Sequence, residues 1–205
     1  MNEFDVKAAE WDLNPMHWSR SEAIAREILK IIPLNKSMTA LEFGAGTGIT
    51  SFLLKDHLKE ITLMDNSREM VRVTNEKIKS SGSKNLRVIE IDLEKDDYTE
   101  VKFDLIFTQM VLHHVIDIEN IIKKFRNLLN LQGHLVIADL YEEDGSFHGN
   151  DFSGHKGFNI NSLSEILRKN NFSDITSGKV FTIDKKISET ESKLFDVFLL
   201  AAKKI

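Results

Sequence analysis

Three glycines alternate within five positions, Gly44, Gly46 and Gly48, directly after the short apolar run 39–43. Because glycine inside a strand or helix costs about 0.5–1 kcal/mol relative to alanine, the pattern needs a local reason. At a strand-to-helix turn, Gly44 would let the chain turn and Gly46 would let a ligand lie against the backbone. Asp65 follows Gly44 by 21 residues, where an acid can accept hydrogen bonds from both hydroxyl groups of a ribose. The spacing predicts a site for a ribose-containing ligand.

Two common nucleotide-binding loops fit this stretch poorly. A dinucleotide-binding loop has the pattern G-x-G-x-x-G, but Ile49 stands at the last glycine position, and the third glycine comes one residue early, at Gly48. The pattern G-x-x-x-x-G-K of the phosphate-binding loop is absent from the sequence. A nicotinamide-dependent dehydrogenase is therefore disfavoured, and the pattern E-x-G-x-G-x-G from Glu42 to Gly48 needs another explanation.

Apolar runs alternate with helical patterns along most of the chain. Short apolar runs predict strands over 39–43, 60–65, 86–92, 103–110 and 134–140. Amphipathic spacing predicts helices over 19–32, 50–58, 68–82, 118–133 and 163–172. This alternation implies parallel strands joined by helical crossovers. Two further strands, 175–183 and 194–203, are separated by a segment too short for a typical crossover, which favours an antiparallel pair.

Composition limits the classes of protein that fit. The chain has 205 residues, 41% of them hydrophobic, which predicts one globular domain. Its net charge of −5 is unlike the clustered basic charge of a nucleic-acid interface. The absence of cysteine excludes disulfides, thiolate zinc sites and cysteine nucleophiles. The N-terminal stretch is acidic and no long apolar stretch occurs, so we expect no signal peptide, no membrane span and a cytoplasmic location.

Five segments, taken in order, resemble the class I S-adenosylmethionine-dependent methyltransferases, in detail over residues 35–140. They are "LEFGAGTG", "LMDNS" with Asp65, "IEIDLE" with Asp92, "FDLIFTQMVLHHV", and "LLNLQGHLVIADL" with Gln132 where the family commonly has a glycine. The resemblance implies an α/β fold with a Rossmann-like, doubly wound sheet of seven strands, mostly parallel with an antiparallel strand seven. It also implies a single methyltransferase domain over residues 1–205.

The same resemblance implies that S-adenosylmethionine is the cofactor and methyl donor. In this family the acid at Glu42 approaches the ammonium group of the cofactor, often through water. Asp65 matches the ribose-binding acid, and Asp92 the acid that meets the adenine amino group. Other roles stay open: a salt bridge or solvated strand end for Glu42, a helix N-cap for Asp65 in competition with Ser67, and a loop acid for Asp92. The expected cofactor-binding residues are Glu42, Gly44, Ala45, Gly46, Asp65, Asn66, Asp92, Leu93 and Gln109.

Two features that the sequence lacks limit the kinds of molecule that could accept the methyl group. Enzymes that methylate amino groups of DNA bases commonly carry an acid-or-Asn–Pro–Pro–aromatic tetrad after strand four, where this chain has "TQMVLHH", and methylation of the cytosine ring needs a cysteine. The chain thus resembles the small-molecule branch, acting as a monomer or homodimer without a nucleic-acid or membrane partner. Whether O, N or C is methylated stays open. The alternative is a regulatory or partner-binding module that binds S-adenosylmethionine without transferring a methyl group.

The acceptor pocket is expected between the N-terminal segment (about 1–34), the loop after strand four and a loop insertion (about 141–162). Trp11 and Trp18 could belong to a helical lid over the cofactor or pack the first helix. Catalytic candidates are His113, His114 and Glu142, and either histidine could equally be a surface residue with ordinary hydrogen bonds.

The loop over 141–162 combines glycines that could act as hinges with aromatic residues that could close over an acceptor. Its imidazole and carboxylate groups could together bind a divalent ion. They show no tight ligand spacing, so we expect no metal and a polar pocket wall or solvated loop. These groups are Glu142, Glu143, Asp144, His148, Asp151 and His155.

Overall fold

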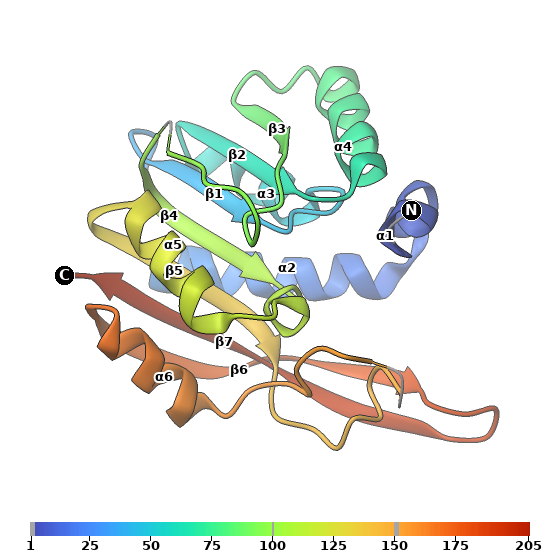
Figure 1. The fold of residues 1–205 in the computed structure, drawn as a ribbon. Helices are drawn as coiled ribbons and strands as arrows, with labels where there is room; N and C mark the ends of the chain where they lie inside the picture. Colours follow the sequence, from blue (N-terminus) through green and yellow to red (C-terminus); the bar gives the residue numbers. More distant parts are fainter. Residues whose placement is uncertain (1–2, 100, 150–151) are drawn as a thin grey trace.

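The structure is a computed structural model that describes residues 3–99, 101–149 and 152–205. Its centre is a seven-stranded sheet in the order β3-β2-β1-β4-β5-β7-β6 (Figure 1). Strands β1 to β5 pair in parallel, and β7 is antiparallel to both β5 and β6. The predicted sheet, mostly parallel with an antiparallel strand seven, is confirmed. The strands are β1 (Thr39–Phe43), β2 (Glu60–Asp65), β3 (Leu86–Glu90), β4 (Phe103–Gln109), β5 (Leu129–Leu140), β6 (Phe172–Lys186) and β7 (Ser192–Lys204).

Helices cover both faces of this sheet (Figure 1). On one face α2 and α3 bury Ile28 and Leu54, and on the other α5 and α6 bury Phe125 and Leu167. Each helix buries one stripe because its apolar residues recur at helical spacing. No described helix has the length and apolar character needed to cross a membrane. The helices are α1 (Glu3–Lys7), η1 (Ala8–Leu13), α2 (Pro15–Ile31), α3 (Ile49–Leu54), η2 (Lys55–His57), α4 (Arg68–Ser81), η3 (Leu112–His114), α5 (Ile118–Leu128) and α6 (Ile160–Lys169).

The helix predicted over 118–133 is wrong in its last part. It ends at Leu128, and Leu129 already pairs with Phe103 as the first residue of β5. Apolar residues at the junction fit either pattern, and Gly133 resembled a glycine that ends a helix. The chain forms a strand from Leu129 onward because pairing with β4 gives its backbone N–H and C=O groups hydrogen-bond partners.

Other boundaries differ by smaller amounts. The helix predicted over 50–58 divides into α3 and the 3-10 turn η2, and α2 begins at Pro15 rather than at residue 19. Strands β6 and β7 are longer than predicted and form a hairpin that extends beyond the rest of the sheet (Figure 1). Gln132, at the position where the family commonly has glycine, adopts a left-handed φ of 65°.

Strand order reverses between β1 and β4, and this reversal positions the site. β1 pairs with β2 on one side and with β4 on the other, so the chain leaves β1 toward α3 on one face and leaves β4 toward α5 on the opposite face. A crevice forms outside the carboxyl ends of strands at such a point. The loops that follow β1, β2, β4 and β5 all begin at this edge.

Candidate active site

The three glycines of the turn after β1 differ in what surrounds them. A Cβ on Gly44 would lie 2.4 Å from a methyl group of Val111, and one on Gly48 would lie 2.4 Å from Leu63. A Cβ on Gly46 would meet only the sulfur of Met70, at 3.9 Å. Gly44 and Gly48 therefore allow close packing, whereas Gly46 borders open space with its backbone exposed to a ligand.

Asp65, at the end of β2, fastens this turn. Its Oδ2 accepts a hydrogen bond from the backbone N–H of Gly46 at 2.7 Å, and its Oδ1 accepts one from Ser67 at 2.8 Å. Burial raises the pKa of Asp65, and the amide hydrogen bonds from Ser67 and Gly46 partly offset this rise. The N-cap of α4 is Ser67, whose Oγ accepts the N–H of Met70, so the capping role considered for Asp65 falls to its neighbour. Each carboxylate oxygen has a second lone pair with which it can accept a ribose hydroxyl.

Glu42, in β1, is a buried carboxylate with one unpaired oxygen. Its Oε2 accepts a hydrogen bond from Ser51 at 2.5 Å, while its Oε1 has no partner among the described residues. Burial raises the pKa of Glu42 to about 8, because the charged form is poorly solvated there. The side chain is neither solvent-exposed nor engaged in an ion pair within the described part of the chain. A cationic donor such as an ammonium group would fit this orphaned oxygen.

Asp92 and Leu93, two further predicted cofactor residues, follow β3 at the same edge of the sheet. Asp92 begins a turn after β3, where its Oδ2 lies 2.6 Å from the amine of Lys95 and its Oδ1 accepts the N–H of Glu94. Leu93 packs its side chain into the core, which leaves only its backbone for a ligand. Asp92 therefore already makes the contacts of a loop acid, and its binding to the cofactor stays a prediction.

Three further predicted residues lie beside the turn. The amide of Gln109 donates to Ser21 at 2.9 Å and joins the end of β4 to α2. Ala45 is buried, and its N–H donates to the carbonyl of Met64 at 3.0 Å. Asn66 is exposed next to Asp65. The three residues lie at the same edge of the sheet, and their contact with a cofactor stays a prediction.

The N-terminal segment crosses the glycine turn. Asp12 accepts a hydrogen bond from Thr47 in the turn and pairs with Lys77 of α4, both at 2.5 Å. Asp5 accepts the hydroxyl hydrogen of Ser67 at 2.7 Å, which places α1 beside the start of α4 (Figure 1). Residues 3–14 therefore cover the side of the crevice that holds the predicted cofactor residues.

Both tryptophans pack within this N-terminal segment. Trp11 stacks on His17 with ring centroids 4.1 Å apart, and Trp18 donates its indole N–H to the carbonyl of Asp12 at 2.9 Å. The packing role considered for them has direct contacts. A role as a lid over the cofactor stays a prediction.

On the other side of the crevice, His113 in η3 is held by a buried carboxylate. The ring Nδ1 of His113 lies 2.6 Å from Oδ1 of Asp139, and the backbone N–H of the same histidine donates to Oδ2 at 3.2 Å. Both residues are almost fully buried. Asp139, in β5, thereby fixes both the position and the ring orientation of His113.

Two buried charged residues on this side were missed by the sequence analysis, Asp139 and Arg20. Burial lowers the pKa of Arg20 to about 10, and the negative charge of Asp139 partly restores it. A signal existed for each. Asp139 interrupts an apolar strand, and Arg20 lies on the same helical stripe as Ile24 and Ile28, where a charged residue is rare unless paired.

The loop after β5 folds back along the sheet instead of projecting into solvent. Glu142 donates its N–H to the carbonyl of Phe158, and His155 donates its N–H to the carbonyl of His113 at 2.8 Å. A Cβ on Gly154 would lie 2.3 Å from that same carbonyl, and one on Gly157 would lie 2.1 Å from the carbonyl of Tyr141. These two glycines therefore serve close packing rather than acting as hinges.

The acids of this loop mostly stabilise the loop itself. Asp144 pairs with Lys193 at 2.6 Å, which holds its pKa well below the usual range, and Glu143 accepts the N–H groups of Gly145 and Phe147. The side chain of Glu142 is exposed, and Asp151 lies outside the described residues. Phe147 is buried in an apolar cluster with β6 and β7, so the loop is anchored at its middle.

One surface groove lies apart from the glycine turn. It has a volume of about 530 Å³ and runs between the start of α5 and α6, with His155 and Phe158 in its wall. None of the predicted cofactor residues lines it, so the geometry of the glycine turn, and not the size of a groove, locates the candidate site.

Comparisons with known proteins identify the family of this chain. A family model described as a methyltransferase domain matches residues 34–192. A protein of Schizosaccharomyces pombe named an uncharacterized methyltransferase is 29% identical over 153 residues, which cover 67% of this chain and 54% of that protein. This chain thus spans about half the length of that relative.

Solved structures share the fold at low sequence identity. A methyltransferase of Haloferax volcanii, solved with the Trm112 methyltransferase activator, has a TM-score of 0.77 and 17% identity, covering 100% of this chain and 98% of that one. Phosphoethanolamine N-methyltransferase 2 of Haemonchus contortus, solved with S-adenosyl-L-methionine, has a TM-score of 0.71 and 14% identity, covering 100% of this chain and 60% of that one. At these identities the likeness concerns the fold.

The first prediction tests the open space beside Gly46. We expect Gly46→Val to lower the affinity for S-adenosylhomocysteine at least about tenfold, because the new side chain occupies the ligand's place; titration calorimetry measures this. The left-handed backbone should cost the variant about 1–2 kcal/mol of stability. Gly44→Val is the contrasting variant, because its side chain meets Val111 and should lower the melting temperature further. Unchanged affinity in Gly46→Val would place the cofactor elsewhere.

The second prediction concerns the proton on Glu42. Folding raises its pKa from 4.5 to about 8, so the folded protein keeps a proton that the unfolded chain releases, and stability falls as the pH rises between these values. In cofactor-free protein, Glu42→Gln removes this term. The wild type should lose up to about 1.4 kcal/mol more stability per pH unit than the variant in this window.

Denaturant titrations of both proteins at several pH values measure the difference. Glu119→Gln, at an exposed acid of α5, is the control and should follow the wild type. Parallel pH profiles for wild type and Glu42→Gln would show that Glu42 is ionised in the cofactor-free protein.

Proposed function

Because this chain belongs to the class I S-adenosylmethionine-dependent methyltransferases, we propose that it transfers a methyl group to a small molecule bound where β4 and β5 end. S-adenosylmethionine supplies a methyl group on a positively charged sulfur, so the protein mainly has to bind and align the two reactants. Such alignment can contribute as much as about 7–11 kcal/mol to the rate. The residues proposed to hold the cofactor are Glu42, Gly46 and Asp65, with Asp92 toward the adenine.

The unpaired Oε1 of Glu42 is the observation that carries the cofactor side. A buried carboxyl oxygen without a hydrogen-bond partner is costly unless a ligand supplies one, and Glu42 lies in β1 just before the turn whose Gly46 borders open space. The cofactor's ammonium group is the kind of donor that this oxygen lacks. Its binding would favour the charged form of Glu42 and lower the pKa of that carboxyl.

A small acceptor is supported by the cover over the crevice. Phe4 of α1 packs against His114 at 5.3 Å, so the N-terminal segment and the β4 side meet. From the loop after β5, Phe152 packs against His114 with ring centroids 5.2 Å apart and stacks on His148 at 4.0 Å. Aromatic and imidazole rings from three segments thus surround the acceptor side, which suits an organic molecule better than a broad macromolecular surface. The similar protein of Haemonchus contortus is named for a small acceptor, phosphoethanolamine.

The third prediction is the test of transfer itself. Incubation with S-adenosylmethionine carrying a labelled methyl group and fractionated pools of small metabolites should give a labelled product together with S-adenosylhomocysteine. Tight cofactor binding with no labelled product from any pool would instead favour a binding module without transferase activity. Once an acceptor is known, Phe152→Ala should raise its KM about tenfold and leave cofactor affinity unchanged.

Phe147→Ala is the matched comparison in the same loop. Because Phe147 is buried in a core cluster, this variant should lose about 3–5 kcal/mol of stability. If Phe152→Ala behaves in the same way and leaves KM unaltered, then Phe152 is a packing residue and the proposed position of the acceptor is wrong.

The fourth prediction concerns which cover moves. Residues 3–14 are held by hydrogen bonds, an ion pair and ring contacts of Phe4 and Trp11, while Val6 and Leu13 are 73% and 75% exposed. This segment buries little apolar surface, which favours its release. The loop after β5 is anchored by buried Phe147 and Phe158. We expect S-adenosylhomocysteine to slow amide hydrogen exchange in 3–14 more than in 141–149. The opposite order would make the loop after β5 the moving lid.

A further inference from the structure

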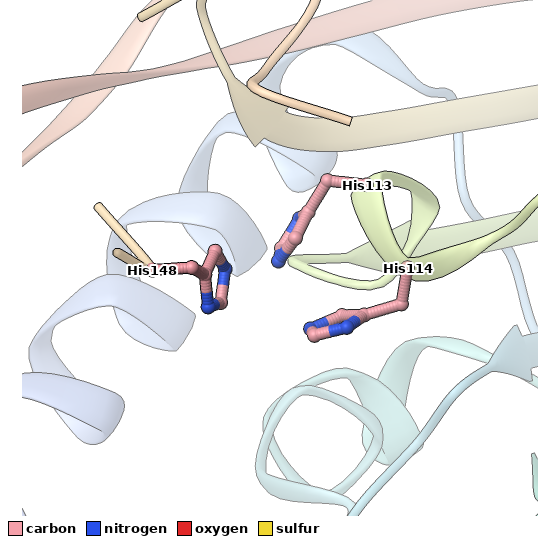
Figure 2. A group of neighbouring side chains, drawn as sticks. All are labelled: His113, His114 and His148. Carbon is pink, nitrogen blue, oxygen red and sulfur yellow. The ribbon is translucent and has the colours of Figure 1, made fainter. Parts of the chain in front are cut away.

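Three histidines from two separate segments converge on the acceptor side of the crevice. His113 and His114 come from η3, and His148 comes from the loop after β5, with their rings turned toward a common space (Figure 2). One ligand atom from each lies within 4.8 Å of the other two. Their ring centroids are 4.3 to 5.2 Å apart. This spacing allows the three rings to bind one metal ion after a small movement.

A carboxylate behind the cluster orients one of these rings. Oδ1 of Asp139 lies 2.6 Å from Nδ1 of His113, and an ionised carboxylate can only accept, so Nδ1 carries the hydrogen and Nε2 presents its lone pair. A histidine that binds a metal almost always donates its other N–H to such a partner. Asp139 also accepts the N–H of Leu140 at 2.7 Å, which fixes the carboxylate in turn.

We propose that His113, His114 and His148 bind a divalent transition-metal ion such as Zn²⁺. Imidazole suits zinc, copper, iron and nickel, whereas Mg²⁺ and Ca²⁺ prefer oxygen ligands. Tetrahedral zinc with bonds of about 2.0–2.1 Å brings its nitrogens to roughly 3.4 Å from one another, so ligand atoms that lie within 4.8 Å must approach by up to about 1.4 Å. The exposed side chain of His148 beside Gly149, whose φ is 91°, can make that adjustment. This departs from the expectation of no metal, which rested on sequence spacing alone.

Three protein ligands leave one position of a tetrahedral ion open, as in catalytic zinc sites. Near the cluster, the rings of Phe4 and Phe152 pack against His114. If the proposed function holds, an oxygen, nitrogen or sulfur atom of the acceptor would occupy the open position. A metal-bound hydroxyl or thiol loses its proton more readily and becomes the stronger nucleophile.

The fifth prediction is metal binding by the full chain. After treatment with EDTA and its removal, titration with ZnCl2 against a chromophoric zinc chelator should give one tight site per chain. His114→Ala and His148→Ala should each weaken that site at least about tenfold, and Asp139→Asn should weaken it about 10–100-fold. His155→Ala is the matched control from the same loop, because His155 contributes its backbone N–H, not its ring, to the contact with His113, and zinc affinity should be unchanged.

Thermal melts of the metal-free variants separate ligand loss from unfolding, and Co²⁺ in place of Zn²⁺ gives a spectroscopic signature of tetrahedral nitrogen ligation. The proposal is overturned if no stoichiometric zinc binds, or if the folded His114→Ala and His148→Ala variants bind zinc as the wild type does. It is also overturned if His113→Gln abolishes methyl transfer but leaves zinc affinity unchanged, because His113 would then act with Asp139 as an acid–base pair and not as a ligand. Cofactor titrations in parallel test the methyltransferase proposal independently, since its residues lie on the other side of the crevice.

Discussion

The reversal of strand order between β1 and β4 is the constraint on which the candidate site depends. Because these neighbours are parallel, the chain leaves both at the same edge, and because their crossovers lie on opposite faces, the two exits diverge. The divergence opens a crevice outside the carboxyl ends of these strands. The glycine turn with Glu42 therefore lies on one side of the crevice, and η3 with His113 lies on the other. Under the proposed function, the methyl donor and the acceptor meet between these two sides.

Two buried acids beside this crevice, Asp139 and Glu42, differ in whether their oxygens have hydrogen-bond partners. Asp139 accepts hydrogen bonds from the ring and backbone of His113 and from the N–H of Leu140, and the charge of Arg20 lies nearby. Glu42 has one donor and an unpaired oxygen. A saturated buried acid fixes its neighbours, whereas an unsaturated one is stabilised by whatever ligand brings the missing donor. Asp139 is thus a positioning residue, and Glu42 is a candidate for direct contact with the cofactor.

The sequence predicted the parts of this arrangement that are encoded locally. Alternating glycines, an acid at the next strand end and strand–helix alternation all follow from short-range pattern, so the sheet and the positions of Gly46 and Asp65 could be anticipated. The end of α5 could not, because pairing of Leu129 with Phe103 joins residues far apart in the chain. For the same reason spacing gave no sign that His148 would meet His113. Asp139 and Arg20 could have been suspected, since a charge in an apolar stripe usually has a partner.

The two halves of the crevice also differ in how they depend on the family. The family model begins at residue 34, but Asp5 and Asp12 before it contact the glycine turn and α4 directly. On the acceptor side, the decisive rings come from η3, from Phe4 and from a loop whose glycines fit closely against its own fold. Under the proposed function, the sheet and the glycine turn hold the methyl donor, while the N-terminal segment, which precedes the family match, and the loop after β5 surround the acceptor. This division explains why proteins with nearly the same backbone can act on different molecules, and why the N-terminal segment and the loop after β5 are the places where acceptor specificity has to be sought.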